Sequence, residues 1–376
     1  MNKSELDEMI NVLDIFAAPG GFSDGFRQAG FRIKGAIDKE RWGCMTLRYN
    51  FRQKTAIIEK DITNLSIKYV ENTLNTNQIG VIIGSPPCQG FSKVGRIKLA
   101  SLNNGKYADD KRNHLYMYFL KFVEYFNPVF VIIENVQEIL SYNNGNIANN
   151  ILYQLEKIGY KSEVKIVNSA WFGVPQNRKR AIFIGNNIGI KNLWNKIFLN
   201  IQNKTVSVGN AISDLNILQH NEGKEVTHYN KNHLTEYQIK MRNSKYLFNH
   251  VARCHNNRDL KYFADLEEGE SSKQKIKFWE DYPYNKNSFT DKYRRLDSSK
   301  PSPTITAHIH KDGLSYIHPT QLRSITVREA ARIQSFRDSF RFMGPRTAQY
   351  KQVGNAVPPL MVTAIANEIK KIISSL

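Results

Sequence analysis

The sequence predicts an α/β protein built on a doubly wound, mostly parallel sheet, with a second, smaller and irregular domain. Short apolar and β-branched runs recur over the first half of the chain, and stretches with helical spacing separate them. Several runs are too continuous for half-exposed strands, which indicates a sheet buried on both faces. The alternation decays after about Asn186, where Asn, Lys, His and Ser with scattered aromatics take over.

Seven strands are expected in the first half. Ligands of such sheets sit beyond the carboxyl ends of the strands, so the residues that follow each run are the candidates for a site. Helical spacing is clearest over residues 115–126 and 151–158. The expected strands are Val12–Phe16, Ile33–Ile37, Ala56–Ile58, Val81–Ile83, Val129–Ile133, Val164–Val167 and Ala181–Ile184.

A regular pattern resumes near Leu322. The spacing predicts a helix over Thr326–Phe336 and a C-terminal helix opened by Pro358 and Pro359. We therefore expect residues 1–186 plus 323–376 to form one domain and residues 187–322 a second. The apolar face of the C-terminal helix comprises Leu360, Met361, Ile365, Ile369, Ile372 and Ile373.

The charge balance favours a polyanionic partner. The 376 residues include 53 Lys and Arg against 34 Asp and Glu, a net charge of +19. Nucleic acid is the natural candidate, and a solvated basic surface is the alternative. Three cysteines imply no disulfide framework, and no apolar run reaches membrane-spanning length. The N-terminus lacks signal-peptide features, so we expect a cytoplasmic location.

The first strand runs into a glycine turn, Asp14 to Ser23, that opens a helix. Glycines such as Gly20 let a ligand approach the backbone, so the turn indicates a nucleotide-like cofactor or merely a tight connection. The second strand ends at Asp38, where such domains place a carboxylate for ribose hydroxyls, and Glu40 is a rival for that role.

The third and fourth strands lead to two further candidates. Asp61 and Ile62 could hold the edge and face of a purine, although Asp61 could equally be a helix N-cap. Pro86 and Pro87 fix the backbone before Cys88 at the same edge of the sheet. Cys88 is therefore either a nucleophile or a buried cysteine in a rigid turn.

The fifth strand ends in Glu134, at the same edge as the cysteine. We expect burial to raise the pKa of its carboxyl group and help it act as an acid. Arg178 and Arg180 precede another expected strand and point the same way in an extended segment. The alternative for these two is a surface basic cluster.

These residues resemble the DNA (cytosine-5)-methyltransferase family of the bacterial restriction–modification type, because six blocks of that family occur in its usual order. Asp110, Arg112 and Leu115 also match its Asp-x-Arg-x-x-Leu pattern. The blocks are Phe16–Gly21, Pro86–Gln89, Glu134–Val136, Gln176–Arg180, Arg328–Gln334 and Gln352–Pro358.

The resemblance implies a Rossmann-like methyltransferase fold, S-adenosylmethionine as cofactor and cytosine in duplex DNA as substrate. Cys88 would add to cytosine C6, and Glu134 would hold N3 and the exocyclic amine while protonating N3. Arg178 and Arg180 would support the nucleophile's surroundings and contact the base O2. The target base must be flipped out of the helix. The positions matching cofactor contacts are Phe16, Gly20, Asp38, Asp61, Ile62, Pro86, Leu115, Asn355 and Val357.

By the same resemblance, residues 1–186 plus 323–376 are the catalytic and cofactor-binding domain, and 187–322 is the target recognition domain. Candidate DNA contacts are Gln89, Ser92, Arg96, Arg253 and Arg294. The recognition span offers further basic candidates that the sequence does not rank. These are His250, His255, Arg258, Lys292, Arg295 and His308.

Three positions depart from the family pattern. Ala18 occupies a usual glycine, Asp38 stands where Glu is commoner, and Arg337 follows Phe336 where Pro is frequent. We expect no zinc at Cys254 and His255, because no second pair at ligand spacing accompanies them. Cys44 is expected to pack in the core.

The other classes of protein that we considered fit less well. An RNA methyltransferase of the tRNA-directed branch would show a Cys-Phe-Thr element, which is not visible. A silent DNA-binding regulator would not need Cys88 and Glu134, and a nicotinamide-dependent oxidoreductase would not explain the Pro-Cys and arginine blocks. We expect a monomeric enzyme without metal or membrane attachment, either solitary or with a cognate restriction endonuclease.

Overall fold

The computed structural model describes residues 8–52, 55–87, 114–199, 205–230, 234–286 and 290–376. The chain divides into two compact units. Unit 1 comprises Met1–Phe172, Lys179–Gln202 and Val357–Leu376. Unit 2 comprises Gly173–Arg178 and Asn203–Ala356.

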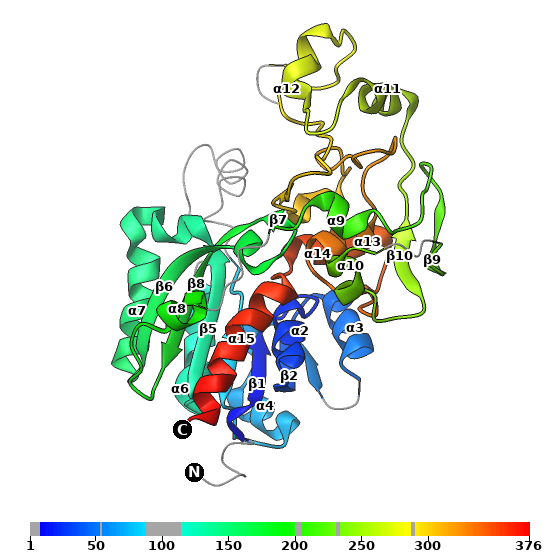
Figure 1. Cartoon of the computed structure of the whole chain (residues 1–376). Coiled ribbons are helices and arrows are strands. Elements are labelled where there is room, and N and C mark those ends of the chain that lie inside the picture. The colour runs from blue at the N-terminus through cyan, green and yellow to red at the C-terminus, as the bar shows by residue number, and fades with distance from the viewer. Residues whose placement is uncertain (1–7, 53–54, 88–113, 200–204, 231–233, 287–289) are drawn as a thin grey trace. The chain divides into compact units, whose positions relative to one another are not determined.

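Unit 1 is built on a 7-stranded sheet with the order β3-β2-β1-β4-β5-β8-β6 (Figure 1). Strands β3, β2, β1, β4 and β5 are mutually parallel, and β8 runs antiparallel to both neighbours. The prediction of a doubly wound, mostly parallel sheet is thereby confirmed. The strands are β1 (Asn11–Ile15), β2 (Arg32–Asp38), β3 (Ala56–Glu59), β4 (Val81–Gly84), β5 (Phe130–Val136), β6 (Lys161–Asn168) and β8 (Lys179–Asn186).

Helices follow most of these strands, whereas β6 is followed by the 3-10 helix η5. The α-helices are α2 (Gly21–Gln28), α3 (Arg41–Asn50), α4 (Ile67–Leu74), α6 (Leu115–Phe126), α7 (Asn146–Lys157), α8 (Leu193–Leu199) and α15 (Pro359–Ser374). The 3-10 helices are η1 (Ile62–Asn64), η3 (Gln137–Leu140), η4 (Tyr142–Gly145) and η5 (Ser169–Phe172).

The main core of unit 1 lies between the sheet and helices α4, α6 and α7. Side chains such as Leu13 and Ile82 from the strands meet Val70, Phe119 and Ile151 from those helices. On α6 the buried residues recur at the expected helical spacing, with Leu115, Phe119, Phe122, Val123 and Phe126 all facing the sheet.

Helix α15 packs beside α2, and both lie in front of the sheet in Figure 1. Gly25 permits this contact, because a Cβ there would lie 2.4 Å from Val362 Cβ. Thr363 Oγ1 donates to the Gly25 carbonyl at 3.2 Å. The predicted apolar face is buried except Leu360, which is half-buried.

Unit 2 consists of short elements joined by long connections. Its strands are β7 (Gln176–Asn177), β9 (Gly223–Thr227), β10 (Leu247–Val251) and β11 (Ser302–Pro303). Its helices are α9 (Val208–Ile212), α10 (Glu236–Met241), α11 (Asn257–Asp265), α12 (Ser272–Lys275), η6 (Ile276–Phe278), η7 (Ala307–His310), α13 (Val327–Ile333) and α14 (Arg346–Asn355).

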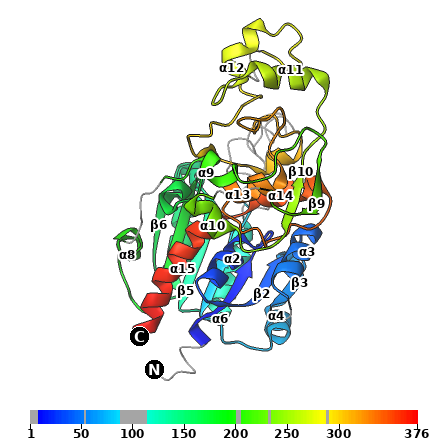
Figure 2. The same ribbon diagram turned by 45° about the vertical axis from the view of Figure 1, so that its right-hand side comes forward.

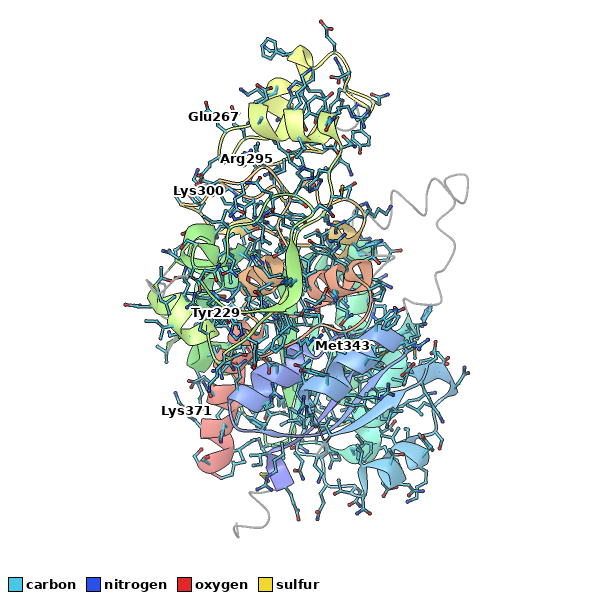
Figure 3. All side chains as sticks on the ribbon, turned by 90° about the vertical axis from the view of Figure 1, so that its right-hand side faces the viewer. Tyr229, Glu267, Arg295, Lys300, Met343 and Lys371 are labelled. Atoms are coloured by element: carbon cyan, nitrogen blue, oxygen red, sulfur yellow. The ribbon has the colours of Figure 1, made fainter. Side chains whose placement is uncertain are left out.

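Buried arginines organise one part of unit 2. Arg332 pairs with Asp338 at 2.6 Å and with Asp214 at 3.2 Å, and Arg323 pairs with Glu329 at 2.7 Å. The Tyr229 hydroxyl donates to Asp338 (Tyr229 is labelled in Figure 3). Because each buried charge has a charged partner, these side chains satisfy one another away from water.

An aromatic cluster forms a second core within unit 2. Tyr262 and Trp279 stack with ring centroids 4.1 Å apart, and Tyr293 meets Tyr262 edge-on. Their polar atoms donate to carboxylates, as in the 2.6 Å bond from Trp279 Nε1 to Asp265 and the 2.7 Å bond from Tyr262 to Asp281. The rings thus stay buried without losing hydrogen bonds.

The two compact units and one helix differ from the expected bounds. Residues 173–178 and 323–356 fall in unit 2, and residues 187–202 fall in unit 1. Residues 323–356 join unit 2 because α13 packs against α9 and β10. Helix α13 ends at Ile333 rather than Phe336, since Ser335 adopts a left-handed φ of 64° and the Phe336 N–H turns back to the Ala331 carbonyl. No helix in the described ranges is long and apolar enough to cross a membrane.

Candidate functional site

The turn between β1 and α2 has an unusual backbone. Phe16 and Ala18 have φ of 62° and 50°, and Gly20 has φ of 97°. Only glycine adopts such values without steric cost. A Cβ on Gly20 would lie 2.6 Å from Leu47 Cδ2, so α3 also closes the space behind the turn. Glycine at position 20 is therefore required both by the left-handed backbone and by the close packing of Leu47.

Asp38, at the end of β2, contacts this turn directly. The N–H of Ala18 donates to Asp38 Oδ2 at 2.8 Å, and the N–H of Glu40 donates to Oδ1 at 2.8 Å. Burial raises the pKa of the Asp38 carboxyl despite these bonds. Glu40, the rival for the ribose role, is exposed and precedes α3. Helix α3 lies beside β2 and β3 (Figure 2).

Asp14 is fully buried on β1, beneath the same turn. Its Oδ2 accepts from the N–H and hydroxyl of Ser23 on α2, at 3.1 and 2.6 Å. Its Oδ1 has no hydrogen-bond partner within the part of the chain that the structure describes. Burial raises the pKa of Asp14 to about 7. Asp14 therefore ties the strand to the first turn of α2.

Asp61 follows β3 and caps η1, since its Oδ1 accepts from the N–H of Thr63 at 3.0 Å. The alternative that Asp61 is an N-cap is therefore confirmed. Its Oδ2 lies 2.9 Å from Lys39 Nζ. The hydrogen bond from Thr63 and the ion pair with Lys39 lower the pKa of Asp61.

The apolar candidates lie near one another. Ile62 and Leu115 are buried members of one core cluster, and Phe16 packs against that cluster. Ile62 follows β3, Leu115 begins α6 and Phe16 follows β1. The structure therefore brings these three apolar side chains together beside the carboxyl edge of the sheet.

Pro86 follows β4 and is buried, and its carbonyl accepts from Asn135 Nδ2 at 3.3 Å. Asn135 lies on the neighbouring strand β5, so it ties the two strand ends together. Cys88 and the candidate DNA contacts Gln89, Ser92 and Arg96 lie outside the described residues.

Glu134 forms the charged pair of the site. It is buried at the end of β5, and Arg180 Nε on β8 lies 2.9 Å from its Oε1. Antiparallel register pairs Val136 with Arg180, which brings the arginine beside the carboxylate. Both side chains are largely removed from water, so the guanidinium places a positive charge beside the buried carboxylate.

Arg178 belongs to unit 2 and is almost fully buried. Its Nη1 donates to the carbonyl of Ile305 at 2.9 Å, and the carbonyl of Gly354 lies 3.5 Å away. The guanidinium therefore holds two backbone segments of unit 2 together. Asn355 ends α14 in unit 2, and Val357 begins the last segment of unit 1.

Glutamines link three distant sequence blocks within unit 2. Gln176 Nε2 donates to Gln334 Oε1 at 2.9 Å, and Gln334 Nε2 donates to the Val353 carbonyl at 2.7 Å. Gln176 Oε1 in turn accepts from the N–H of Ile305 at 2.8 Å. The arginine block, the Arg328 block and the Gln352 block thus meet through two buried side chains.

The basic candidates of the recognition span differ in their surroundings. Arg253 donates to the Ile309 carbonyl at 2.6 Å and covers the Tyr350 ring, and Arg294 pairs with Asp291. Arg295 (labelled in Figure 3) is buried and donates to the Phe263 carbonyl. His250 is buried against Thr326, and burial lowers its pKa. His255 is also buried, Lys292 is half-buried, and Arg258 and His308 are exposed.

Sequence reasoning gave no role to Asp14, Asn135, Gln176 or Gln334. For Asn135 the available signal was its place next to Glu134 at the same strand end. No sequence signal predicted the bonds of Gln176, because its partners lie about 130 and 158 residues away.

Cys44 is buried on α3, and burial raises the pKa of its thiol to about 12. Among the described residues, no group of three His, Cys, Asp or Glu could hold a metal ion.

The fold and these residues define a class: a doubly wound α/β enzyme with polar groups at the carboxyl edge of its parallel strands. Residues 10–371 match the family described as C-5 cytosine-specific DNA methylase. The chain belongs to this family, and it is a DNA (cytosine-5)-methyltransferase.

Relatives of known name cover nearly the whole chain. The chain is 35% identical to the type II methyltransferase M.DdeI of Desulfomicrobium norvegicum, over 96% of this chain and 88% of that protein. It is 34% identical to the type II methyltransferase M1.HphI of Haemophilus parahaemolyticus, over 96% and 87%. A crystal structure described as a DNA modification methyltransferase encoded within an E. coli prophage superposes with a TM-score of 0.77 at 25% identity, covering 97% of this chain and 99% of that one.

Proposed function

We propose that this chain transfers a methyl group from S-adenosylmethionine to C5 of a cytosine flipped out of duplex DNA, through a covalent bond between Cys88 and C6. The observation that carries the proposal is the pair of Glu134 and Arg180 beside Asn135, which holds the carbonyl of Pro86. Pro86 lies two residues before Cys88 in the sequence, so the acid and the cation lie on strands beside the one that leads toward the thiol.

The groups at the strand ends fit the cofactor. Ribose hydroxyls and an adenine amino group donate hydrogen bonds, and Asp38 and Asp61 supply carboxylate acceptors. Gly20 lets the turn between β1 and α2 pack closely on Leu47 in a left-handed backbone conformation. S-adenosylmethionine would supply a methyl group on a sulfonium, which a carbon nucleophile can accept. We assign to this site Phe16, Gly20, Asp38, Asp61, Ile62, Pro86, Leu115, Asn355 and Val357.

Cytosine C5 is a poor nucleophile until another nucleophile adds at C6. The Cys88 thiolate would form the S–C6 bond and open the C5–C6 double bond, while Glu134 delivers a proton to N3. The electron pair then resides at C5, which takes up the methyl group. Loss of the C5 proton restores the double bond and expels the thiolate.

The two arginines would have distinct roles in this reaction. Arg180 would stabilise the carboxylate form of Glu134 through its 2.9 Å ion pair. Arg178 would act near the base O2, with its guanidinium kept in place by the carbonyls of Ile305 and Gly354. Because C5, C6 and N3 lie within the base stack, the reaction requires base flipping.

Residues 187–322 would recognise the target sequence. We assign DNA contacts to Gln89, Ser92 and Arg96 and to Arg253 and Arg294, which supply polar or cationic side chains. The relatives M.DdeI and M1.HphI are named as type II methyltransferases. By this likeness the chain would act in the bacterial cytoplasm as the monomeric modification enzyme of a restriction–modification system.

A mechanism-based trap tests the nucleophile. DNA with 5-fluorocytosine at the target should form a complex that survives denaturing electrophoresis, because fluorine cannot leave as the C5 proton does. Cys88→Ser should abolish trapping and methylation while leaving DNA binding in place, since oxygen is a far weaker nucleophile than sulfur at similar size. Matched controls are Cys44→Ser and Cys254→Ser, which should both still trap. An adduct that maps to Cys44 or Cys254 would overturn the assignment.

The acid is tested separately. Glu134→Gln should lose about 100-fold or more in kcat, because the amide cannot supply the N3 proton. The control is Glu59→Gln, which removes a carboxylate that pairs with Arg48 at an exposed position of the same sheet. Methylation that persists at the normal rate in Glu134→Gln would exclude the role of that residue.

A further inference from the structure

Lys39 and Asp61 form an ion pair between two strand ends at the carboxyl edge of the sheet in unit 1. Lys39 follows the last residue of β2, and Asp61 lies two residues after β3. These strands are parallel neighbours, so the chain brings both side chains to the same edge. Lys39 Nζ lies 2.9 Å from Asp61 Oδ2. The function proposed above assigns Asp61 to the cofactor and leaves Lys39 without a role.

The pair is accessible to a ligand. The side chains of Lys39 and Asp61 are 57% and 33% exposed. Ion pairs with this much exposure contribute little to stability, because water screens the two charges. The cap of η1 does not depend on Lys39 either, since Asp61 makes it through the N–H of Thr63. Stability therefore does not account for the pair, and its charged atoms face the edge where ligands of such sheets bind.

The hydrogen bonds of Asp61 leave one acceptor position for a ligand. Its Oδ1 accepts from the N–H and the hydroxyl of Thr63, at 3.0 and 2.9 Å, and its Oδ2 accepts from Lys39. A carboxylate has about four acceptor positions, so about one remains, on Oδ2. The bond from Thr63 and the pair with Lys39 lower the pKa of Asp61, so the group stays an acceptor at neutral pH. The Lys39 ammonium has several N–H groups, and the pair uses one of them.

Apolar side chains lie beside the pair. Ile62 directly follows Asp61 and is buried in one core cluster with Leu115, and Phe16 packs against that cluster. A flat heterocycle could therefore contact apolar groups with its face and the charged pair with its edge.

The pair presents an acceptor next to a donor, and this order matches the edge of adenine. Adenine has an amino group at C6, which donates, next to N1, which accepts. Hypoxanthine has the reverse order, because its C6 carries a carbonyl oxygen and its N1 carries a hydrogen. Against hypoxanthine, the Asp61 carboxylate would face an acceptor and the Lys39 ammonium would face a donor. A site built on such a pair favours one base over the other.

We propose that Lys39 and Asp61 together recognise the adenine of the cofactor, with Asp61 accepting from the C6 amino group and Lys39 donating to N1. Lys39 is thereby a specificity-determining residue. The inference rests on the function proposed above, in which this edge of the sheet binds S-adenosylmethionine.

Three ligands test the role of Lys39. They are S-adenosylhomocysteine, its 1-deaza analogue, in which C–H replaces N1, and S-inosylhomocysteine, which carries hypoxanthine. Lys39→Met should raise the Kd of S-adenosylhomocysteine at least about fivefold, because it removes one charge-assisted donor. It should leave the Kd of the 1-deaza analogue unchanged, and the preference for adenine over hypoxanthine should narrow accordingly. Calorimetry measures each Kd.

The matched control is Lys60→Met. It removes the same charge one residue before Asp61, but the Lys60 ammonium lies over the Tyr69 ring, 3.9 Å from its centroid. This variant should change none of the three Kd values. The Tm of Lys39→Met should stay within about 1 °C of that of the unaltered protein, because the pair is exposed.

The 1-deaza analogue separates direct contact from an indirect effect, because it keeps the amino group that Asp61 binds. An equal rise in Kd for this analogue and for S-adenosylhomocysteine would mean that Lys39 acts through Asp61 or through the fold, which overturns the inference. Unchanged Kd values for both ligands in Lys39→Met overturn it as well, while the proposed cofactor stands. If the unaltered protein does not bind S-adenosylhomocysteine, the proposed cofactor is wrong and the inference falls with it.

Discussion

Asp14 shows how a single buried carboxylate can link stability to pH. It lies on β1 with no exposed surface, and both donors that reach its Oδ2 come from Ser23. Two neutral donors compensate the loss of water only in part, so burial raises the pKa to about 7. Folding therefore favours the protonated form of this group.

We expect the stabilising effect of Asp14 to fall as pH rises. The folded pKa of about 7 exceeds the ordinary value of 3.8, so the stabilisation is complete below about pH 4 and is lost as pH rises through about 7. The measurement is the Tm of the unaltered protein minus that of Asp14→Asn, taken from pH 5 to 8. The difference should decrease over this range and level off above it. A difference that grows with pH would contradict the raised pKa.

At the residue scale, the sequence predicted the place of a residue correctly where that place depends on neighbours close along the chain. Asp38, Asp61 and Glu134 lie at strand ends as expected, because strand boundaries follow from local apolar runs. Arg295 was a candidate DNA contact but is buried. It donates to the carbonyls of Phe263 and His318, which lie 32 and 23 residues away in the sequence. Such long-range partners leave no local pattern.

Helix α14 packs tightly on η7 within unit 2. Gly354 is the reason, because a Cβ there would lie 2.4 Å from the backbone of Thr306 and Ala307. The Gly354 carbonyl lies near Arg178, so the same contact also shapes the surroundings of that guanidinium.

Gly354→Ala should therefore destabilise the protein by about 2 kcal/mol or more, because backbone on both sides must shift to admit the methyl group. The control is Gly185→Ala in β8, where the added methyl would lie 3.6 Å from Ser162 and Tyr160, an ordinary contact distance. Urea unfolding of both variants gives the comparison. Equal midpoints for the two would show that α14 and η7 are not in contact as described.

At the element scale, the elements of unit 1 were predictable, whereas in unit 2 the sequence predicted only the helix over Thr326–Phe336, observed as α13. The strands of unit 1 are continuous apolar runs that need no partner to be recognised. Helices of unit 2 such as α9 and α12 span 5 and 4 residues and are defined by capping boxes of Ser207 and Ser271. Patterns this short contain less than two helical turns, so the hydrophobic period gives no signal.

The net charge of +19 overstates the positive charge that is accessible to DNA. Arg323, Arg328 and Arg332 are fully buried, and residues 256–286 carry six Lys and Arg against seven Asp and Glu. Around η7, in contrast, partial burial of the His308 ring and the nearby cations Lys311 and Lys292 lower the pKa of His308. Basic charge is therefore unevenly distributed over unit 2.

We expect DNA affinity to fall at least about tenfold between 50 and 200 mM salt, because Lys and Arg contacts release counterions from the phosphates. Lys311→Glu, next to His308, should weaken binding and reduce the salt dependence. Lys277→Glu, in the acidic stretch, is the matched charge reversal and should change neither. Fluorescence anisotropy with a labelled duplex over a salt series measures both, and affinity that stays constant with salt would refute the electrostatic contribution.

The contact of α15 with α2 can form only at the end of synthesis, because α15 is the last helix to be made. Lys370 Nζ reaches the carbonyl of Ala29, which emerges from the ribosome 341 residues earlier. At a synthesis rate of about 5–20 residues per second, the face of α2 that α15 covers stays without its partner helix for roughly 20–70 s. Nascent chains would keep this apolar surface uncovered throughout, so chaperone binding should concentrate on α2 until translation of the last helix is complete.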